Sequence, residues 1–129
     1  MDEIMEFLKE SKVCFIATSQ DGQPYVRPQG FTMKYGGALC FCTADGKDTS
    51  KQLKANPKVE IGSCSGMKFI RIRGKAEFIT DEAATKQALE IMPQLEQIIR
   101  PGKLEIFAVK DGTAVIADMS TGESKTIEF

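Results

Sequence analysis

Apolar side chains follow a helical period in a few short stretches of the chain and a strand period in most of the rest. Residues 2–11 place Ile4, Phe7 and Leu8 on one face with charged residues outside, and so predict an amphipathic helix with Asp2 as its N-cap. The same period, bounded by capping residues or by proline, predicts three further helices at residues 48–56, 80–92 and 93–100, the second of them starting at a Thr-Asp cap.

The remaining segments are short runs of β-branched and aromatic residues that glycine-containing turns separate. Asp21-Gly22 and Gly36-Gly37 favour two-residue hairpin turns, because glycine takes the positive φ angles that these turns need. Asp111-Gly112 predicts a third hairpin turn. The predicted strands are residues 13–19, 24–30, 31–35, 38–43, 59–64, 68–79, 104–110 and 113–119, with residues 125–129 as an added edge.

Six or more short antiparallel strands with few helices between them favour a mainly β fold, a β-barrel with peripheral helices. The sequence lacks the glycine fingerprint of a Rossmann sheet. A chain of 129 residues fits one domain over residues 1–129. One small barrel has little room for a deep ligand cleft, so a dimer would help to build one.

Charge and hydropathy narrow the classes of partner. The chain has 17 basic and 18 acidic residues and a formal net charge of −1, so it has no global positive field and nucleic acid is disfavoured. The N-terminus is acidic where a secretory signal would be basic, and no apolar run approaches the ~20 residues that span a bilayer. We therefore expect a cytoplasmic protein that does not bind membranes.

The cysteines and the absence of histidine restrict the chemistry. Cys14, Cys40, Cys42 and Cys64 lie in apolar segments without a C-x-x-C spacing, and we expect reduced thiols and no metal site. The chain contains no histidine, which removes the usual general base and the usual proximal haem ligand. A bound cofactor is therefore expected to carry most of the chemistry.

Arg27 stands in the middle of a predicted strand. If it faces the barrel interior, an anion such as a phosphate or carboxylate is needed to offset its charge; if it faces outward, it is an ordinary surface residue, and periodicity does not decide between the two. Pro28 has no N–H group, which predicts a strand at the edge of the sheet with free backbone groups nearby for a flat ligand.

A second cationic position is the start of the predicted helix at residues 48–56. Thr49, Ser50 and Lys51 bring two hydroxyls and an ammonium to unpaired backbone N–H groups, and Thr43 ends the preceding strand. This combination predicts an anion-binding cradle. The alternative is that Thr49 and Ser50 only cap the helix and that Lys51 is solvated.

Together these segments resemble the pyridoxamine 5'-phosphate oxidase-like, FMN-binding split-barrel family. The resemblance rests on G-x-P-x-V-R-P, an aromatic-rich strand ending in threonine, an x-S-K-x-L helix and a closing N-P-x-V, and it extends from Glu6 to Ala117. It implies an antiparallel split barrel that forms a homodimer with FMN sites between the subunits. Arg27, Ser50 and Lys51 would then grip the FMN phosphate. The other implied contacts are Pro28 and Gln29 along the isoalloxazine and Thr43 near the ribityl chain or the phosphate.

Departures from that family narrow the expected activity. Authentic pyridoxamine 5'-phosphate oxidases are longer and hold the substrate phosphate with C-terminal arginine and histidine residues, which this sequence does not offer. We expect no vitamin B6 oxidation. We expect an FMN-dependent oxidoreductase that transfers hydride or electrons to an unidentified small molecule, with NADH or NADPH as a candidate donor. The alternatives are a non-catalytic flavin carrier or redox sensor, an F420-binding reductase, and a barrel that binds oligonucleotides.

Overall fold

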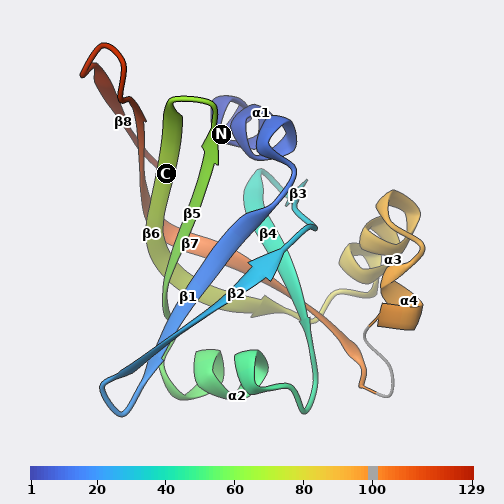
Figure 1. The fold of residues 1–129 in the computed structure, drawn as a ribbon. Helices are drawn as coiled ribbons and strands as arrows, with labels where there is room; N and C mark the ends of the chain where they lie inside the picture. Colours follow the sequence, from blue (N-terminus) through green and yellow to red (C-terminus); the bar gives the residue numbers. More distant parts are fainter. Residues whose placement is uncertain (99–101) are drawn as a thin grey trace.

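Short strands build one antiparallel sheet that curls into a split barrel, as a computed structural model describing residues 1–98 and 102–129 shows (Figure 1). The sheet has eight strands in the order β2-β1-β5-β6-β7-β4-β3, with β8 paired to β7. The predicted mainly β fold is therefore confirmed. The strands are β1 (Cys14–Gln20), β2 (Gln23–Gln29), β3 (Met33–Tyr35), β4 (Ala38–Ala44), β5 (Lys58–Ser65), β6 (Lys68–Ile79), β7 (Leu104–Asp118) and β8 (Ser124–Glu128).

The first two predicted hairpin turns are confirmed. Asp21 and Gly22 have φ angles of 52° and 79°, and they connect β1 to β2. Gly36 and Gly37 have φ angles of 57° and 79° between β3 and β4. Positive φ at both central residues is the conformation of the turns whose twist matches that of paired strands.

The third predicted hairpin turn is wrong, because β7 runs unbroken through Asp111 and Gly112. Asp111 has a φ of 50°, and the register with β6 shifts between Arg73 and Lys75, so the two β7 residues form a bulge opposite Gly74. A residue in the left-handed region beside glycine suits a bulge as well as a turn. The strand bends at this point, and its first half pairs with β4 while its second half pairs with β8.

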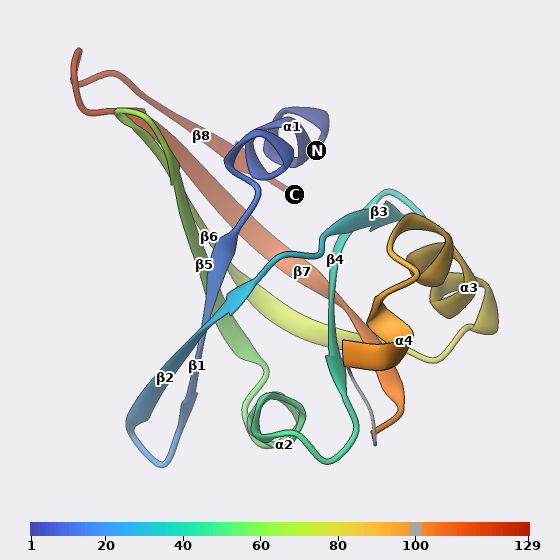
Figure 2. The ribbon, with the colours of Figure 1, turned by 45° about the vertical axis from the view of Figure 1, so that its right-hand side comes forward.

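The helices in the described part of the chain lie around the outside of the barrel (Figure 2). Within the described residues, none of them is long and apolar enough to cross a membrane. The prediction of Asp2 as a cap is wrong, since Met1 is the N-cap and the Asp2 carboxylate accepts a hydrogen bond from Lys34 Nζ at 2.7 Å. Asp81 does occupy the N-cap of the third helix, but its side chain makes no capping hydrogen bond. The helices are α1 (Asp2–Ser11), α2 (Asp48–Ala55), α3 (Glu82–Ile91) and α4 (Leu95–Ile98), and residues 99–100 of the last predicted helix lie outside the described residues.

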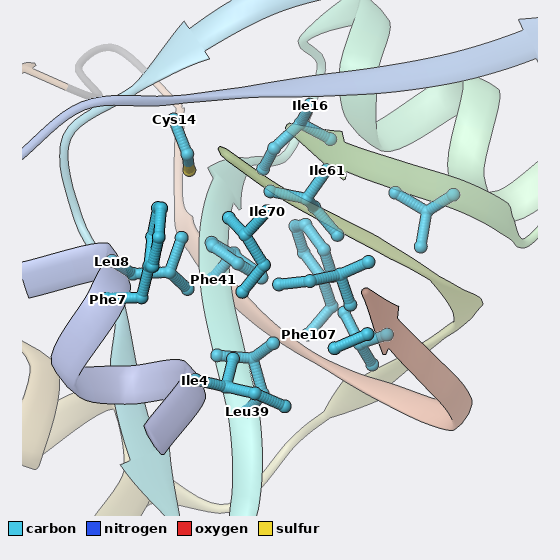
Figure 3. Close-up of a cluster of buried hydrophobic side chains, with 14 of the residues drawn as sticks. Ile4, Phe7, Leu8, Cys14, Ile16, Leu39, Phe41, Ile61, Ile70 and Phe107 are labelled. Carbon is cyan, nitrogen blue, oxygen red and sulfur yellow. The ribbon is translucent and has the colours of Figure 1, made fainter. Parts of the chain in front are cut away.

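The main core fills the barrel between the strands and α1 (Figure 3). Phe41 and Phe107, from paired strands, have ring centroids 6.0 Å apart. The apolar face of α1 points into this cluster and covers one end of the barrel. β4 is buried along its whole length, because Phe41 faces this core while Cys40 and Cys42 face a second core under α3 and α4. β4 therefore holds its C-terminal end, from which the chain leads to α2, in a fixed position.

Candidate functional site

A cleft of about 400 Å³ lies between the edge strand β2, the end of β4, the start of α2 and the segment around α4. Figure 2 shows β2 on the left of this region, α2 at the bottom, and β4 between α2 and α4. The polar lining residues are Arg27, Gln29, Thr43, Lys47 and Thr49. The size lies in the range of about 300–1,000 Å³ that small-molecule sites occupy. The cleft thus brings together residues from several separate segments of the chain.

Apolar side chains form the other wall of the cleft. Ile16 comes from β1, Pro28 from β2 and Phe31 from the loop that follows it, while Met92 and Leu95 come from the segment around α4. Ile16, Phe31 and Leu95 are buried, so they are held by packing on their other sides. A wall of this kind suits a flat apolar ring system rather than a freely hydrated ligand.

Arg27 points inward, which decides the alternative that the sequence left open. It pairs in register with Ile16, a buried residue of β1, and donates a hydrogen bond from Nη1 to the Ile16 carbonyl at 3.3 Å. Nη1 also donates to Thr18 Oγ1 at 2.8 Å, and Nη2 donates to Gln52 Oε1 at 2.5 Å. Burial lowers the pKa of Arg27 while the Asp48 carboxylate opposes that shift, and the guanidinium remains charged.

Sequence reasoning missed the pair Thr18 and Gln52. Both side chains are buried, with exposed fractions of 3% and 5%, and Thr18 Oγ1 donates to Gln52 Oε1 at 2.6 Å. The sequence offered no clear signal for Gln52, since most glutamines are exposed and its burial is seen only in the structure. Its partners could not be read from the sequence, because they lie 34 and 25 residues away.

The start of α2 supplies the second cationic side of the cleft. Lys47 is the N-cap residue and Thr49 lies in the first turn, and both line the cleft. Backbone N–H groups of a first helical turn have no acceptor within the helix, and the helix dipole adds positive potential there. Lys47 was not among the predicted residues, although its position directly before the helix was a usable signal. Thr43 lines the cleft at the end of β4 as expected.

Ser50 and Lys51 do not line the cleft. Ser50 is buried, and its hydroxyl donates to Glu105 Oε1 on β7 at 2.5 Å. Glu105 also accepts a hydrogen bond from Lys54 Nζ at 2.7 Å, so both residues tie α2 to the barrel. Lys51 is exposed, one turn into the helix. Their assignment as phosphate ligands stays a prediction.

Gln29 and Pro28 are both at the cleft, on the edge strand that the proline predicted. The Gln29 amide is tied to its neighbours, because Nε2 donates to the Cys42 carbonyl at 2.7 Å and Oε1 accepts from the Phe31 backbone N–H at 3.4 Å. These bonds hold the end of β2 against β4. The amide therefore shapes the wall of the cleft and is less free to turn toward a ligand.

The residues that line the cleft include no histidine, aspartate or glutamate. Burial raises the pKa of Cys42 to about 12, and burial raises that of Cys14, next to the cleft on β1, to about 11. Both thiols therefore stay protonated and unreactive. Among the residues that the structure describes, no three histidine, cysteine, aspartate or glutamate side chains come together as a metal site.

A second basic surface lies on the outer face of the sheet, in a hollow of about 410 Å³ lined by Lys58, Arg71, Arg73 and Lys75. Arg73 forms an ion pair with Glu60, and the Arg71 guanidinium lies 5.7 Å from the Phe69 ring centroid. These cations are all exposed to solvent. The cleft at β2 and α2 is the better site for an anionic cofactor.

Comparison with known proteins supports the family resemblance that the sequence motifs indicated. A family profile described as Pyridoxamine 5'-phosphate oxidase matches residues 1–116. No curated protein sequence gives a significant match. Among solved structures, a NimC/NimA family protein from Clostridium acetobutylicum has a TM-score of 0.91 and 30% identity, over 100% of this chain and 93% of that one.

More distant structures show the fold alone. A heme binding protein from Mycobacterium smegmatis has a TM-score of 0.75 at 17% identity, over 95% of this chain and 55% of that one. A FAD-binding protein from Mesorhizobium loti has a TM-score of 0.63 at 20% identity, over 87% of this chain and 89% of that one. The profile covers most of the sequence and includes every strand that borders the cleft. The chain therefore belongs to the pyridoxamine 5'-phosphate oxidase family.

Proposed function

We propose that this chain binds FMN, as a homodimer with sites bordered by both subunits, and acts as a flavin-dependent oxidoreductase on a small molecule. The observation that carries the proposal is the cleft, in which a half-buried, hydrogen-bonded arginine and the start of a helix face an apolar wall. A phosphate fits the cationic side and a flat ring fits the apolar side.

The phosphate side consists of Arg27, Thr49, Lys47 and the backbone N–H groups that begin α2. Lys51, an exposed residue one turn into α2, is kept as a phosphate ligand because of the family resemblance. Ser50 is kept as a proposed phosphate ligand because of the family resemblance, although its hydroxyl donates a hydrogen bond to Glu105. Thr43, Pro28 and Gln29 border the space for the ribityl chain and the ring.

The residues present fit a flavin better than haem. The chain has no histidine, and the thiol of Cys42 in the cleft has a pKa of about 12, so neither usual kind of axial ligand is offered. The structures of similar fold include both a FAD-binding protein and a heme binding protein, so the residues of this cleft, rather than the fold, favour the flavin. FAD and F420 are alternative cofactors for the same anion site. Identification of the bound molecule would distinguish them from FMN.

When bound, the flavin supplies hydride or electron transfer. The residues of this chain bind its phosphate, orient its ring against the apolar wall and exclude water from one side. The described lining of the cleft has no histidine, aspartate or glutamate to transfer a proton, and burial raises the pKa of the Cys42 thiol to about 12. That observation also favours a second candidate, a non-catalytic flavin carrier or redox sensor. Steady turnover of NADH or NADPH with an acceptor would separate the two.

The test of the cofactor begins with the visible spectrum of protein purified without added flavin and after addition of FMN, followed by mass analysis of the molecule released on unfolding. Arg27→Ala with Lys51→Ala should abolish FMN retention and leave the fold intact. Arg71→Ala with Lys75→Ala removes the same charge from exposed positions on β6 and is the control. FMN affinity that is unchanged in the first double variant would overturn the assignment.

The proposal of a homodimer is based on the outer face of β1 and β2. Phe15 is 51% exposed and Val26 is 67% exposed. Phe15 pairs with Pro28, and Ala17 pairs with Val26, so these residues share one outward apolar face. Pro28 also lines the cleft, so the face continues to its rim and a second copy covering it would close the open side.

Light scattering after size exclusion tests the dimer. Phe15→Glu with Val26→Glu should give a monomer that binds FMN weakly. Ile91→Glu, at an exposed position on α3 away from this face, should leave the oligomeric state unchanged. A wild-type monomer that retains FMN would contradict the dimer and leave the cofactor assignment standing.

A further inference from the structure

Arg27 is held by two neutral side chains that also bind each other. Its guanidinium donates to Thr18 Oγ1 at 2.8 Å and to Gln52 Oε1 at 2.5 Å, and these acceptors are themselves joined by a hydrogen bond of 2.6 Å. Two acceptors so close together lie at the end of the guanidinium fork, one against each terminal nitrogen. The remaining bond from Nη1, to the Ile16 carbonyl, lies on the side of the side-chain stem.

This arrangement leaves one edge of the guanidinium for a ligand. An arginine has five N–H donors, and the described residues accept from Nη1 and Nη2 but not from Nε. The Nε–H group and the outer N–H of Nη2 are parallel, which is the geometry that binds two oxygens of a phosphate or carboxylate at once. Arg27 lines the cleft, and the N–H groups of this edge are the ones for which the described residues provide no acceptor.

The two partners orient the arginine without neutralising it. Both are uncharged, so the guanidinium keeps its full charge for the ligand, whereas a carboxylate in the same place would pair with it. Asp48, an exposed residue of the first turn of α2, is the carboxylate whose charge acts on Arg27. Because Thr18 lies on β1 and Gln52 on α2, the same bonds also fix the distance between Arg27 and the helix start.

We propose that Thr18 and Gln52 are positioning residues for the cofactor phosphate. They hold Arg27 so that its Nε/Nη2 edge meets the phosphate together with the start of α2, and they thereby set the preference of this site for FMN over riboflavin, which lacks the phosphate. This inference rests on the proposed function. It assigns the preference to two residues that do not touch the ligand.

The test compares the affinities for FMN and riboflavin, measured by quenching of flavin fluorescence, in matched variants. Thr18→Val keeps the shape and removes the hydroxyl, and it should weaken FMN binding about tenfold or more, as expected when a hydrogen bond that orients a charged group is lost. Riboflavin binding should change less than twofold. Thr18→Ser restores a hydroxyl and should restore most of the FMN affinity, while Thr80→Val is the control at an exposed position.

Gln52 gives a second, independent set of variants. Gln52→Met removes the acceptor and should act like Thr18→Val on the two flavins. Gln52→Glu keeps an oxygen for Arg27 but adds a charge, so it should weaken FMN binding even if it makes the protein more heat-stable. A variant that fails to fold, as judged by circular dichroism, is replaced by the other set, since either hydroxyl loss or acceptor loss tests the same bonds.

The outcomes separate this inference from the proposed function. Equal weakening of FMN and riboflavin, or FMN binding in Thr18→Val and Gln52→Met that matches wild type, overturns the positioning role. If wild type prefers FMN and Arg27→Met abolishes the preference while Thr18→Val keeps it, the proposed function stands and the positioning role is wrong. Wild-type protein that binds neither flavin, or binds both equally, overturns the phosphate role of Arg27 and with it the inference.

Discussion

The hydroxyl of Ser50 provides a direct test between a structural and a ligand-binding role at the start of α2. The sequence pattern assigns it to the cofactor phosphate, whereas the structure has it donating to Glu105 at 2.5 Å. Ser50→Ala removes this bond and adds no bulk. If the bond to Glu105 is its main role, the substitution should lower stability and change FMN affinity less than twofold.

The size of the effect follows from the surroundings. A hydrogen bond to a charged group contributes about 1.5–3 kcal/mol. The Glu105 side chain is 19% exposed and keeps its ion pair with Lys54, so water and Lys54 compensate part of the loss and the lower value applies. Alanine is the better helix former by about 0.5 kcal/mol. The net loss should be about 1 kcal/mol, which for a chain of this length is a fall in Tm of about 3–5 °C.

Thermal and urea unfolding of the flavin-free protein measure the stability, and fluorescence titration measures the FMN affinity. Ser124→Ala, at an exposed position on β8, is the control and should change neither. Ser50→Ala combined with Glu105→Gln should destabilise less than the sum of the single substitutions, because both disturb one hydrogen bond. An unchanged Tm with a tenfold loss of FMN affinity would refute the structural reading and restore Ser50 as a phosphate ligand.

Three further predictions follow from burial, charge and close packing. Burial raises the pKa of Cys42 from 9.0 to about 12, so the free energy of unfolding should fall as the pH rises above about 9, because the unfolded chain releases this proton first. At pH 8 a thiol reagent should modify the exposed Cys64 quickly and Cys42 only on unfolding. Rapid labelling of Cys42, detected by peptide mass spectrometry, would contradict this prediction. Asp48→Asn should tighten FMN binding severalfold at low salt and weaken the start of α2 by about 0.3–1 kcal/mol, and an affinity that does not respond would separate Asp48 from the anion site. A Cβ atom on Gly112 would lie 2.2 Å from Phe129 Cζ, so Gly112→Ala should cost about 1–3 kcal/mol in urea unfolding, and adding it to Phe129→Ala should cost little more than Phe129→Ala alone.

Local patterns predicted most of the elements within one or two residues of their observed ends. The helix over residues 2–11 and the strand over residues 68–79 agree with α1 and β6. Period and turn chemistry are local properties, and here the tertiary structure does not oppose them. The bulge at Asp111 and Gly112 is the exception, because one dipeptide serves a hairpin turn and a bulge equally well, and only pairing with both β6 and β8 decides which forms.

The residue types of the site were also available in the sequence. A charged side chain in a predicted strand, a proline beside it and hydroxyls at a helix start favoured an anion and a flat ligand, although the period left the direction of the arginine open. Arg27, Pro28, Gln29, Thr43 and Thr49 accordingly line one cleft.

Only the tertiary structure decided which way each polar group points. Which side of α2 meets the barrel depends on the packing of Leu53, and that packing turns Ser50 toward Glu105 and Gln52 toward Arg27. These contacts join residues 55 and 25 positions apart, so no local period records them. The sequence by itself determined the mainly β fold and two of its hairpin turns, and it favoured an anion site near the start of α2. The partners that orient Arg27 arise only when β1, β2 and α2 are packed together.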